Sequence, residues 1–367
     1  MDGQHRVKTR TNGTRGLDPR VVQVSKVRMN PYVRLLQDGL REVGISCSLA
    51  DGLSPRLVRS WQGTFDVLHV HWLELLYASP HPARSVRLLL AVLMGLVWAK
   101  VGGCRVVYTV HNLDPHEQVF PLLNRIANRT VFALADAMHV HDEEARRSVA
   151  RAYRRRDRIY VIPHGSYVGA YLNNCTKQEA RRRLGLAEDA FVYLFLGQVR
   201  RYKGIEDLVA AFSQLANETS ELVIAGNVHD AVYGEELTQL TRGRTEIHTW
   251  FQYVPDSEVQ YFMNACDVCV LPYREVMTSG AAVLAFSFGR PIIAPALGGF
   301  NELVADGRGI VYSPAVDDGL LRALQQARFE DMAEAGRKAL AWAREHTWQA
   351  LGPKFARIYA DVLRTGK

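Results

Sequence analysis

Short apolar runs alternate along the chain with longer stretches in which apolar residues recur every three or four positions. The short runs are rich in valine and isoleucine, which favours strands, and the longer stretches have the period of amphipathic helices. In the first half, strands are predicted at residues 21–27, 46–49, 67–71, 106–110, 137–140 and 159–162. In the second half, they are predicted at residues 192–196, 222–225, 247–250, 268–271, 291–294 and 310–312.

Strands and helices that alternate in this way form parallel sheets covered by helices on both faces. The expected fold class is α/β, with two Rossmann-like, doubly wound parallel-sheet domains that face each other across a cleft. We expect an N-terminal domain over residues 21–165, a linker over 166–187 and a C-terminal domain over 188–340. Residues 1–20 are expected to be a flexible basic arm, and the helices of 341–367 to cross back toward the N-terminal domain. Such folds bind ligands at the carboxyl ends of their strands, so the cleft is the expected site.

Composition places the chain among folded globular proteins. Of its 367 residues, 48% are hydrophobic and 23% are charged, which is enough apolar material for two cores. The net charge of +7 favours anionic partners such as acidic lipids and phosphorylated metabolites. Nucleic acid is not an expected partner, because no aromatic platform accompanies the basic residues. Five cysteines without a signal-peptide pattern favour reduced thiols and a cytoplasmic location.

Two features of the first half favour contact with the inner face of a membrane. The run "LLLAVLMGLVWA" at residues 88–99 is shorter than the roughly 20 residues that cross a bilayer. It is either a buried core helix or a helix lying on a membrane surface, with Arg84, Arg87, Trp98 and Lys100 at its margins.

The second feature is basic. If "EEARRSVARAYRRRDR" is helical, five arginines form one stripe on it: Arg147, Arg151, Arg154, Arg155 and Arg158. This stripe is either a solvated face or a second part of the same membrane surface. A peripheral membrane contact is therefore expected as one of two alternatives.

The segment "VCVLPYREVMTSGAAVLAFSFGRP" at residues 268–291 places Thr-Ser-Gly between two apolar runs. Thr278 is expected to cap a helix that ends at Gly-Arg-Pro. Ser279 and Gly280 then lie in its first turn, just beyond a strand. Backbone amides at such a position attract phosphate through hydrogen bonds and the helix dipole.

A second anion site is predicted in "FLGQVRRYKGIEDL", where a strand leads through a loop into a helix. Gly197 allows close approach of the backbone. Arg200, Arg201 and Lys203 can neutralise a leaving diphosphate. Two anion sites at strand ends of one domain indicate a nucleotide.

These motifs resemble those of a known family. Together with "DVLHVHW" at 66–72, "YTVHNLDPHE" at 108–117 and "GGFNELV" at 298–304, they look like the motifs of GT-B glycosyltransferases of the family 4 kind, the glycosyltransferases group 1. The resemblance covers about residues 20–360. It implies the GT-B fold and transfer of a sugar from a nucleoside diphosphate sugar to an acceptor held by the first domain, with no metal and no other cofactor.

The resemblance also implies roles for individual residues. Arg200 and Lys203 would contact the diphosphate, Glu302 would lie near the nucleotide or the donor sugar, and His111 would lie beside the reacting sugar. The complete set expected to bind the donor is Gly197, Arg200, Arg201, Lys203, Glu275, Thr278, Ser279, Gly280 and Glu302.

The sequence departs from the family pattern in two places. Gln198 follows the glycine where many members have arginine. Many retaining members carry two glutamates seven residues apart, but Val276 and Leu284 occupy those positions here, with Glu275 displaced by one residue. The stereochemical outcome is therefore open.

An inverting enzyme needs a base for the proton of the acceptor. The segment "HNLDPHE" follows a predicted strand and offers Asp114, His116 and Glu117 for this role. Asp114 precedes a proline and can instead serve only to shape a turn.

Two other groups of residues carry weaker signals. Cys266 and Cys269 fall where a helix runs into a strand, and they are expected to be core thiols. His69 and His71 alternate on one face of a strand, where a packed or substrate-facing role is expected. The sequence has no Asp-x-Asp motif, so a metal-bound diphosphate is not expected.

The leading hypothesis is a glycosyltransferase that uses a GDP- or UDP-sugar and a lipid-linked or membrane-proximal glycan acceptor in polysaccharide or glycolipid biosynthesis. One alternative is a nucleotide-sugar 2-epimerase of the same architecture, whose soluble substrate would leave the apolar run at 88–99 unexplained. Another is a non-catalytic family member that binds a sugar nucleotide or an anionic polymer.

Overall fold

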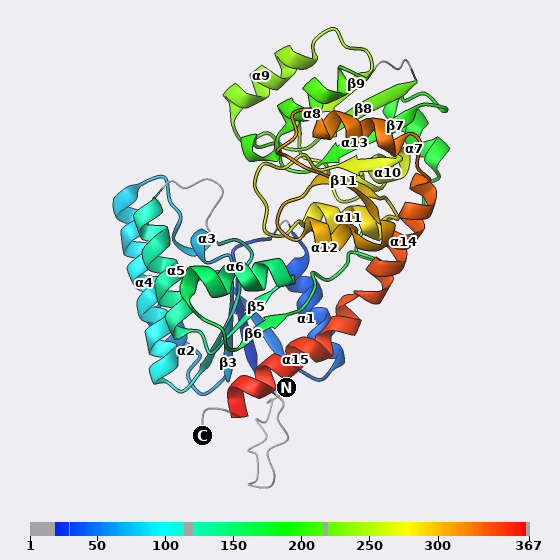
Figure 1. The fold of residues 1–367 in the computed structure, drawn as a ribbon. Coiled ribbons are helices and arrows are strands. Elements are labelled where there is room, and N and C mark those ends of the chain that lie inside the picture. Colours follow the sequence, from blue (N-terminus) through cyan, green and yellow to red (C-terminus); the bar gives the residue numbers. More distant parts are fainter. Residues whose placement is uncertain (1–18, 29, 114–119, 216–218, 365–367) are drawn as a thin grey trace, which may run out of the picture.

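Two six-stranded parallel sheets organise the computed structural model, which describes residues 19–28, 30–113, 120–215 and 219–364 (Figure 1). The first sheet contains β1 (Val21–Val24), β2 (Cys47–Ala50), β3 (Val67–His71), β4 (Arg105–Thr109), β5 (Ala137–Val140) and β6 (Ile159–Val161). The second contains β7 (Phe191–Leu196), β8 (Ser220–Ala225), β9 (Ile247–Trp250), β10 (Val268–Val270), β11 (Ile292–Pro295) and β12 (Gly309–Tyr312). The predicted fold class is confirmed, and every predicted strand is present. The predicted basic arm lies almost wholly outside the described residues.

The strand order in each sheet creates a reversal point. The orders are β2-β1-β3-β4-β5-β6 and β12-β11-β10-β7-β8-β9, and neighbouring strands pair in parallel. β2 lies on one side of β1, and β3, the next strand along the chain, lies on the other side. In the second sheet, β7 likewise lies between β8 on one side and β10 on the other. Doubly wound sheets bind ligands beside such points, outside the carboxyl ends of the strands.

Helices cover both faces of the first sheet. The helices of this half are α1 (Tyr32–Glu42), α2 (Pro55–Ser60), α3 (Leu73–Tyr77), α4 (Pro82–Val101), α5 (Pro121–Leu134) and α6 (Glu143–Tyr153), joined by the C-terminal α15 (Trp348–Arg364). α1 and α15 pack on one face, against Val21, Val67 and Val107. The other helices pack on the opposite face, where Val22 and Leu68 point. The alternation of side chains along each strand thus supplies two separate cores.

The second sheet and its helices share one continuous core. Its helices are α7 (Lys177–Leu184), α8 (Ile205–Phe212), α9 (Ala231–Thr241), α10 (Val259–Ala265), α11 (Gly280–Ser287), α12 (Phe300–Val304), α13 (Gly319–Ala327) and α14 (Met332–Glu345). α7 belongs to the segment 166–187 that the sequence analysis treats as a linker, and it packs against α10. Cys266 and Cys269 are buried in this core.

The prediction that five arginines of the first domain form one stripe on a helix is wrong. α6 ends at Tyr153, because Arg154 adopts a left-handed conformation with φ 52°. The Arg155 guanidinium turns inward and donates hydrogen bonds to backbone carbonyls at the C-terminal end of α5, at 2.7 and 3.0 Å. The last four carbonyls of a helix have no hydrogen-bond partner within that helix. Arg155 supplies partners for carbonyls at the end of α5 and is therefore not part of an exposed arginine face.

α15 returns from the second domain and locks onto α1 (Figure 1). Gly39 on α1 and Gly352 on α15 face each other where the two helices cross. A methyl group at Gly352 would overlap the carbonyl oxygen of Gly39, and one at Gly39 would overlap the carbonyl oxygen of Trp348. At the start of α15, the Trp348 ring packs edge-on against Tyr32 with 4.7 Å between ring centroids. Backbone contact therefore fixes the C-terminal helix on the first domain.

A Gly352→Ala substitution tests this crossing. We expect it to lower the melting temperature, because a backbone oxygen cannot move aside and overpacking costs about 1 to 3 kcal/mol. Gly52→Ala is the matched control, since a methyl group there meets only the Leu57 side chain at 3.7 Å. Equal melting temperatures for the two variants would show that the crossing tolerates a side chain.

Candidate active site

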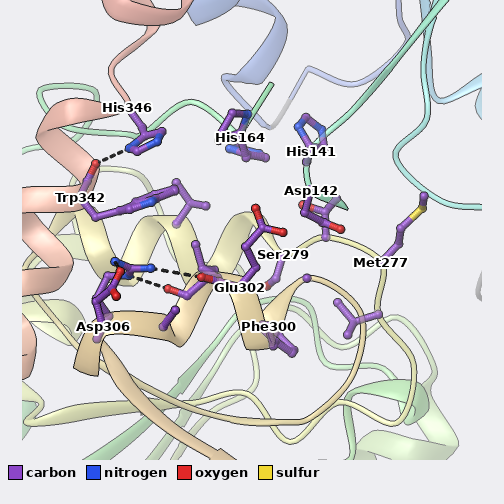
Figure 2. Close-up of a pocket in the computed structure, with 18 of the residues that line it drawn as sticks. His141, Asp142, His164, Met277, Ser279, Phe300, Glu302, Asp306, Trp342 and His346 are labelled. Atoms are coloured by element: carbon purple, nitrogen blue, oxygen red, sulfur yellow. Dashed lines mark hydrogen bonds and ion pairs between the residues drawn. The ribbon is translucent and has the colours of Figure 1, made fainter. Parts of the chain in front are cut away.

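A cavity of about 420 Å³ lies between the two sheets (Figure 2). The first domain contributes residues that follow two neighbouring strands, β5 and β6. The second contributes the loop after β10, the start of α11, and α12. The end of α14 closes one side with Trp342 and His346, whose rings stack with 4.2 Å between centroids. The cavity thus lies where the strand ends of the two domains meet, and its lining includes His141, Asp142, His164, Met277, Thr278, Ser279, Glu302, Trp342 and His346.

The N-terminus of α11 meets this cavity. Ser279, rather than the predicted Thr278, caps the helix: its hydroxyl oxygen accepts a hydrogen bond from the Ala282 amide at 3.3 Å. Both residues line the cavity. Gly280, the first helical residue, lies so close to the first domain that a methyl group there would come within 3.2 Å of the Tyr167 hydroxyl oxygen. The first helical turn has only small side chains of its own, as the sequence predicts, and at Gly280 it lies against Tyr167 and His164.

The two predicted anion-binding segments adjoin each other. Lys203 extends over the Tyr273 ring, with Nζ 3.5 Å from the ring centroid. The Tyr273 hydroxyl in turn interacts with Ser279. The loop before α8 is pressed against the segment after β10, because a side chain at Gly204 would overlap the Pro272 carbonyl oxygen. Lys203 and Ser279 thus both contact Tyr273, one at the ring and one at the hydroxyl.

The half-buried amine of Lys203 is electrostatically unusual. Burial, with a smaller contribution from the charge of Arg200, lowers its pKa to about 7. The free amine is therefore only partly protonated at neutral pH. An anion bound beside it would raise this pKa and draw in a proton.

Other residues predicted to bind the donor have different surroundings. Arg201 is paired with Glu236 at 2.8 Å and lies over the Tyr233 ring, so its contacts are with α9. The Arg200 Nε donates to the Gln198 side chain at 3.0 Å. Glu275 is exposed and does not line the cavity. Gly197 has φ 155° and open space where a side chain would be, which leaves its backbone accessible.

Glu302 and Asp142 face the cavity from opposite domains (Figure 2). Glu302 Oε2 accepts a hydrogen bond across the domain boundary from the Glu143 backbone amide, at 3.2 Å. Asp142 is 7% exposed, and its Oδ1 accepts from the Ala145 amide at 2.7 Å. Burial, together with the negative charges of Glu302 and Glu144, raises the pKa of Asp142 to about 6.

His111 belongs to a buried histidine cluster rather than to the cavity lining. Its ring stacks on Trp72 with 3.7 Å between centroids, and its Nε2 lies 3.3 Å from Nδ1 of His71. His69 bonds to Thr109 and Tyr359, at 2.7 and 2.8 Å. Burial lowers the pKa of His71 to about 3, so this ring is neutral. The packed alternative for the His69 and His71 pair is the one that the structure shows.

His141, Asp142 and His164 were not among the predicted site residues, and the predicted bases Asp114, His116 and Glu117 lie outside the described residues. A signal for the missed residues was present: His141 and Asp142 directly follow the predicted strand at 137–140. The strand-end rule that located Ser279 would have located them as well. Among the described residues, no group of three or more histidine, cysteine or acidic side chains is placed to hold a metal ion.

Comparison with known proteins agrees with this geometry. Residues 190–331, most of the second domain, match the family model of glycosyl transferases group 1. The chain is 25% identical to a GDP-mannose:glycolipid 4-beta-D-mannosyltransferase from Xanthomonas campestris pv. campestris, over 91% of this chain and 89% of the relative. It is 24% identical to a D-inositol 3-phosphate glycosyltransferase from Corynebacterium aurimucosum, over 96% of this chain and 86% of that relative.

Solved structures show the same architecture. Sucrose-phosphate synthase from Thermosynechococcus elongatus gives a TM-score of 0.73 at 17% identity, over 94% of this chain and 100% of that chain. HepE from Anabaena, in complex with UDP, gives 0.72 at 16% identity, over 93% and 100%. The resemblance to group 1 glycosyltransferases with the GT-B fold is confirmed, and the chain is a glycosyltransferase.

Replacing Lys203 tests its contribution to binding a diphosphate. We expect Lys203→Met to weaken the affinity for a nucleoside diphosphate by about 10- to 100-fold, since a hydrogen bond to a charged group contributes about 1.5 to 3 kcal/mol. The amine must be protonated to pair with phosphate, so wild-type affinity should fall as the pH rises above about 7. Titration calorimetry across pH 6 to 9 measures both effects, with the exposed Lys354→Met variant as control. A variant with unchanged affinity and the same pH dependence would place the diphosphate elsewhere.

Proposed function

We propose that the chain transfers a sugar from a GDP- or UDP-sugar to a lipid-linked or membrane-proximal glycan acceptor, in polysaccharide or glycolipid biosynthesis. The observation that carries this proposal is that the α11 N-terminus and Glu302 line a cavity that both domains share. Lys203 is outside that lining and is connected to the α11 N-terminus through Tyr273. One relative is named for GDP-mannose and a glycolipid, and one structural neighbour holds UDP and glucose. Both names support the proposed classes of donor and acceptor.

The geometry supports a transfer in which protein groups neutralise the departing diphosphate. The diphosphate would lie at the first turn of α11, where backbone amides and the helix dipole favour negative charge. Lys203 would take up a proton and pair with it. Glu302 would accept hydrogen bonds from hydroxyl groups of the donor sugar, and the acceptor would approach from the first domain. No resident metal is part of this proposal.

Nucleotide binding and turnover test the proposal in sequence. We expect GDP or UDP, but not ADP, to raise the melting temperature, because a ligand at 100 times its Kd stabilises the folded state by about 2.7 kcal/mol. Incubation with GDP- and UDP-sugars and a lipid-linked glycan, followed by mass spectrometry, should then show a product one sugar heavier.

The outcomes separate the alternatives. A 2-epimer formed without acceptor would favour the epimerase, and a donor that is bound but never consumed would favour a non-catalytic protein. If no nucleotide stabilises the protein and no donor is turned over, the proposed function as a whole is contradicted.

An apolar surface on the first domain supports a membrane-proximal acceptor. It comprises exposed side chains that recur at helical spacing along α4, together with two on the adjacent α5: Val86, Leu90, Met94, Val97, Trp98, Val101, Leu122 and Ile126. Exposed arginines on the same two helices, including Arg84, Arg87 and Arg125, border it. Figure 1 shows α4 and α5 on the outer flank of the first domain, away from α15. Among the described residues, no helix is long and apolar enough to cross a bilayer.

We infer that this α4–α5 surface rests on an anionic membrane. Apolar side chains flanked by arginines are typical of helices that lie in the interface between headgroups and acyl chains. Each basic residue near an anionic surface adds about 1 kcal/mol. The surface would hold the first domain where a lipid-linked acceptor is found.

Charge substitution on this surface tests the inference. We expect the double variant Leu90→Glu, Met94→Glu to lose at least about tenfold in co-sedimentation with phosphatidylglycerol vesicles, because two carboxylates oppose both apolar insertion and the anionic charge. Val232→Glu on α9 is the control, since Val232 is also exposed, at 61%, but lies on the second domain. Equal binding by the double variant and the control would contradict the membrane role.

A further inference from the structure

We propose that Asp142 is the catalytic base that accepts the proton of the attacking hydroxyl, and that the enzyme therefore inverts the anomeric configuration of the transferred sugar. This inference rests on the proposed function and deepens it. Asp142 is a carboxylate of the first domain in the wall of the shared cavity, and the α11 N-terminus and Glu302 line the cavity from the second domain (Figure 2).

The backbone fixes the orientation of this carboxylate. Asp142 directly follows β5 and caps α6, with Oδ1 held by the Ala145 amide. Its other oxygen, Oδ2, faces the second domain, where a side chain at Gly299 would overlap it. The cap thus leaves one oxygen directed across the domain boundary, toward the loop that begins α12.

Capping alone does not account for the surroundings of Asp142. Asp230 and Asp331 also cap helices, but both are exposed to water. Asp136, which is partly buried, is paired with Lys100 at 2.7 Å. Within the described part of the chain, no lysine or arginine pairs with Asp142, although it is 7% exposed. A carboxylate that is buried without a cation is costly, and such groups concentrate at functional sites.

The neighbouring groups make this carboxylate a stronger base. Glu302 on α12 and Glu144 on α6 are the charged groups that act on it, and both are acidic. The imidazole of His164, after β6, is kept neutral because burial lowers its pKa to about 4. His141, 5% exposed and on the cavity wall, has no hydrogen-bond partner on either ring nitrogen among the described residues. Neither imidazole therefore adds a positive charge beside Asp142 that would lower its pKa.

The proposed step is a single displacement. The acceptor oxygen forms a bond to C1 of the donor sugar, and its proton passes to Asp142. The bond between C1 and the diphosphate oxygen breaks, and its electron pair leaves with the diphosphate toward α11 and Lys203. In a single displacement the attacking oxygen approaches C1 from the face opposite the leaving group, so the proposed step inverts C1. Val276 and Leu284, at the positions of the glutamate pair of many retaining members, agree with this outcome.

Asp142→Asn is the variant that tests the base. Asparagine caps helices as well as aspartate does and has no charge to bury, so we expect a melting temperature at least as high as that of the wild type and unchanged nucleotide affinity. The rate of transfer, as kcat/KM for the acceptor, should fall by about 100- to 10,000-fold, the range for loss of a general base. Asp331→Asn makes the same substitution at an exposed cap and should leave transfer unchanged.

Two further measurements distinguish a base from a structural carboxylate. Wild-type kcat/KM should fall as the pH drops below about 6, because a protonated Asp142 cannot accept a proton, and Asp142→Asn should lack this limb. Nuclear magnetic resonance of the product should show the anomeric configuration opposite to that of the donor.

The results also separate this inference from the proposed function. If the wild type transfers sugar with retention, or if Asp142→Asn stays within about threefold of the wild type, the base assignment fails and the transferase stands. Absence of transfer by the wild type with every donor would overturn the proposed function itself.

Discussion

Parallel strand pairing determines where chemistry can occur in this protein. In a parallel sheet every strand ends at the same edge, so the loops and helix starts that follow the strands gather there. Two such edges face each other here. Asp142 follows β5 of one sheet, and Ser279 and Glu302 follow β10 and β11 of the other, which brings residues far apart in sequence to one cavity. Neither sheet contains the complete wall.

The chain crosses between the domains twice, and the two crossings touch. The Ser166 amide donates to the His346 carbonyl at 2.8 Å, joining the segment after β6 to the segment between α14 and α15. Two further hydrogen bonds cross the boundary: the Tyr167 amide donates to Ser287 Oγ at 2.9 Å, and the Glu143 amide donates to Glu302. Met277 also packs against the apolar core of the first domain. Where two domains move relative to each other, adjacent crossings are where a hinge can absorb the motion. α15, locked on α1, gives the first domain a firm anchor beside that hinge.

Local sequence patterns predicted the strands and helices. Contacts between residues far apart in sequence determined which individual side chains lie at the surface or at the cavity, and local patterns did not predict these contacts. Valine-rich runs located the strands because their burial on both sides leaves a continuous apolar signal. Ser279 replaced Thr278 as the cap, a one-residue error typical of helix ends. The arginine stripe failed because a left-handed Arg154 ends α6, and Arg155 serves carbonyls of α5, a contact that no local pattern encodes. Asp142 differs from Arg155: it directly follows a predicted strand, so the strand-end rule could have located it, and only the residues of the second domain that face it were beyond the reach of local patterns.

The charges at the cavity differ from those elsewhere in the molecule. Arg201 and Asp136 lie in ion pairs, whereas burial shifts Lys203 and Asp142 toward their neutral forms, with pKa values of about 7 and 6.

These two pKa values affect how stability depends on pH. A lysine in the unfolded chain titrates near pH 10.4, so between about pH 7 and 10 the unfolded chain binds more protons than the folded chain. The contribution of Lys203 therefore makes stability rise with pH in this range. For Asp142 the folded chain holds the proton more tightly than the unfolded one, whose aspartate titrates near 3.9, and stability falls as the pH rises from about 4 to 6. Near neutral pH both side chains therefore oppose folding. A diphosphate bound beside Lys203 would supply the negative charge that this amine lacks in the folded protein. A hydroxyl proton that passes to Asp142 would neutralise its buried carboxylate. The stability lost at these two positions therefore favours binding of the substrate and transfer of the proton.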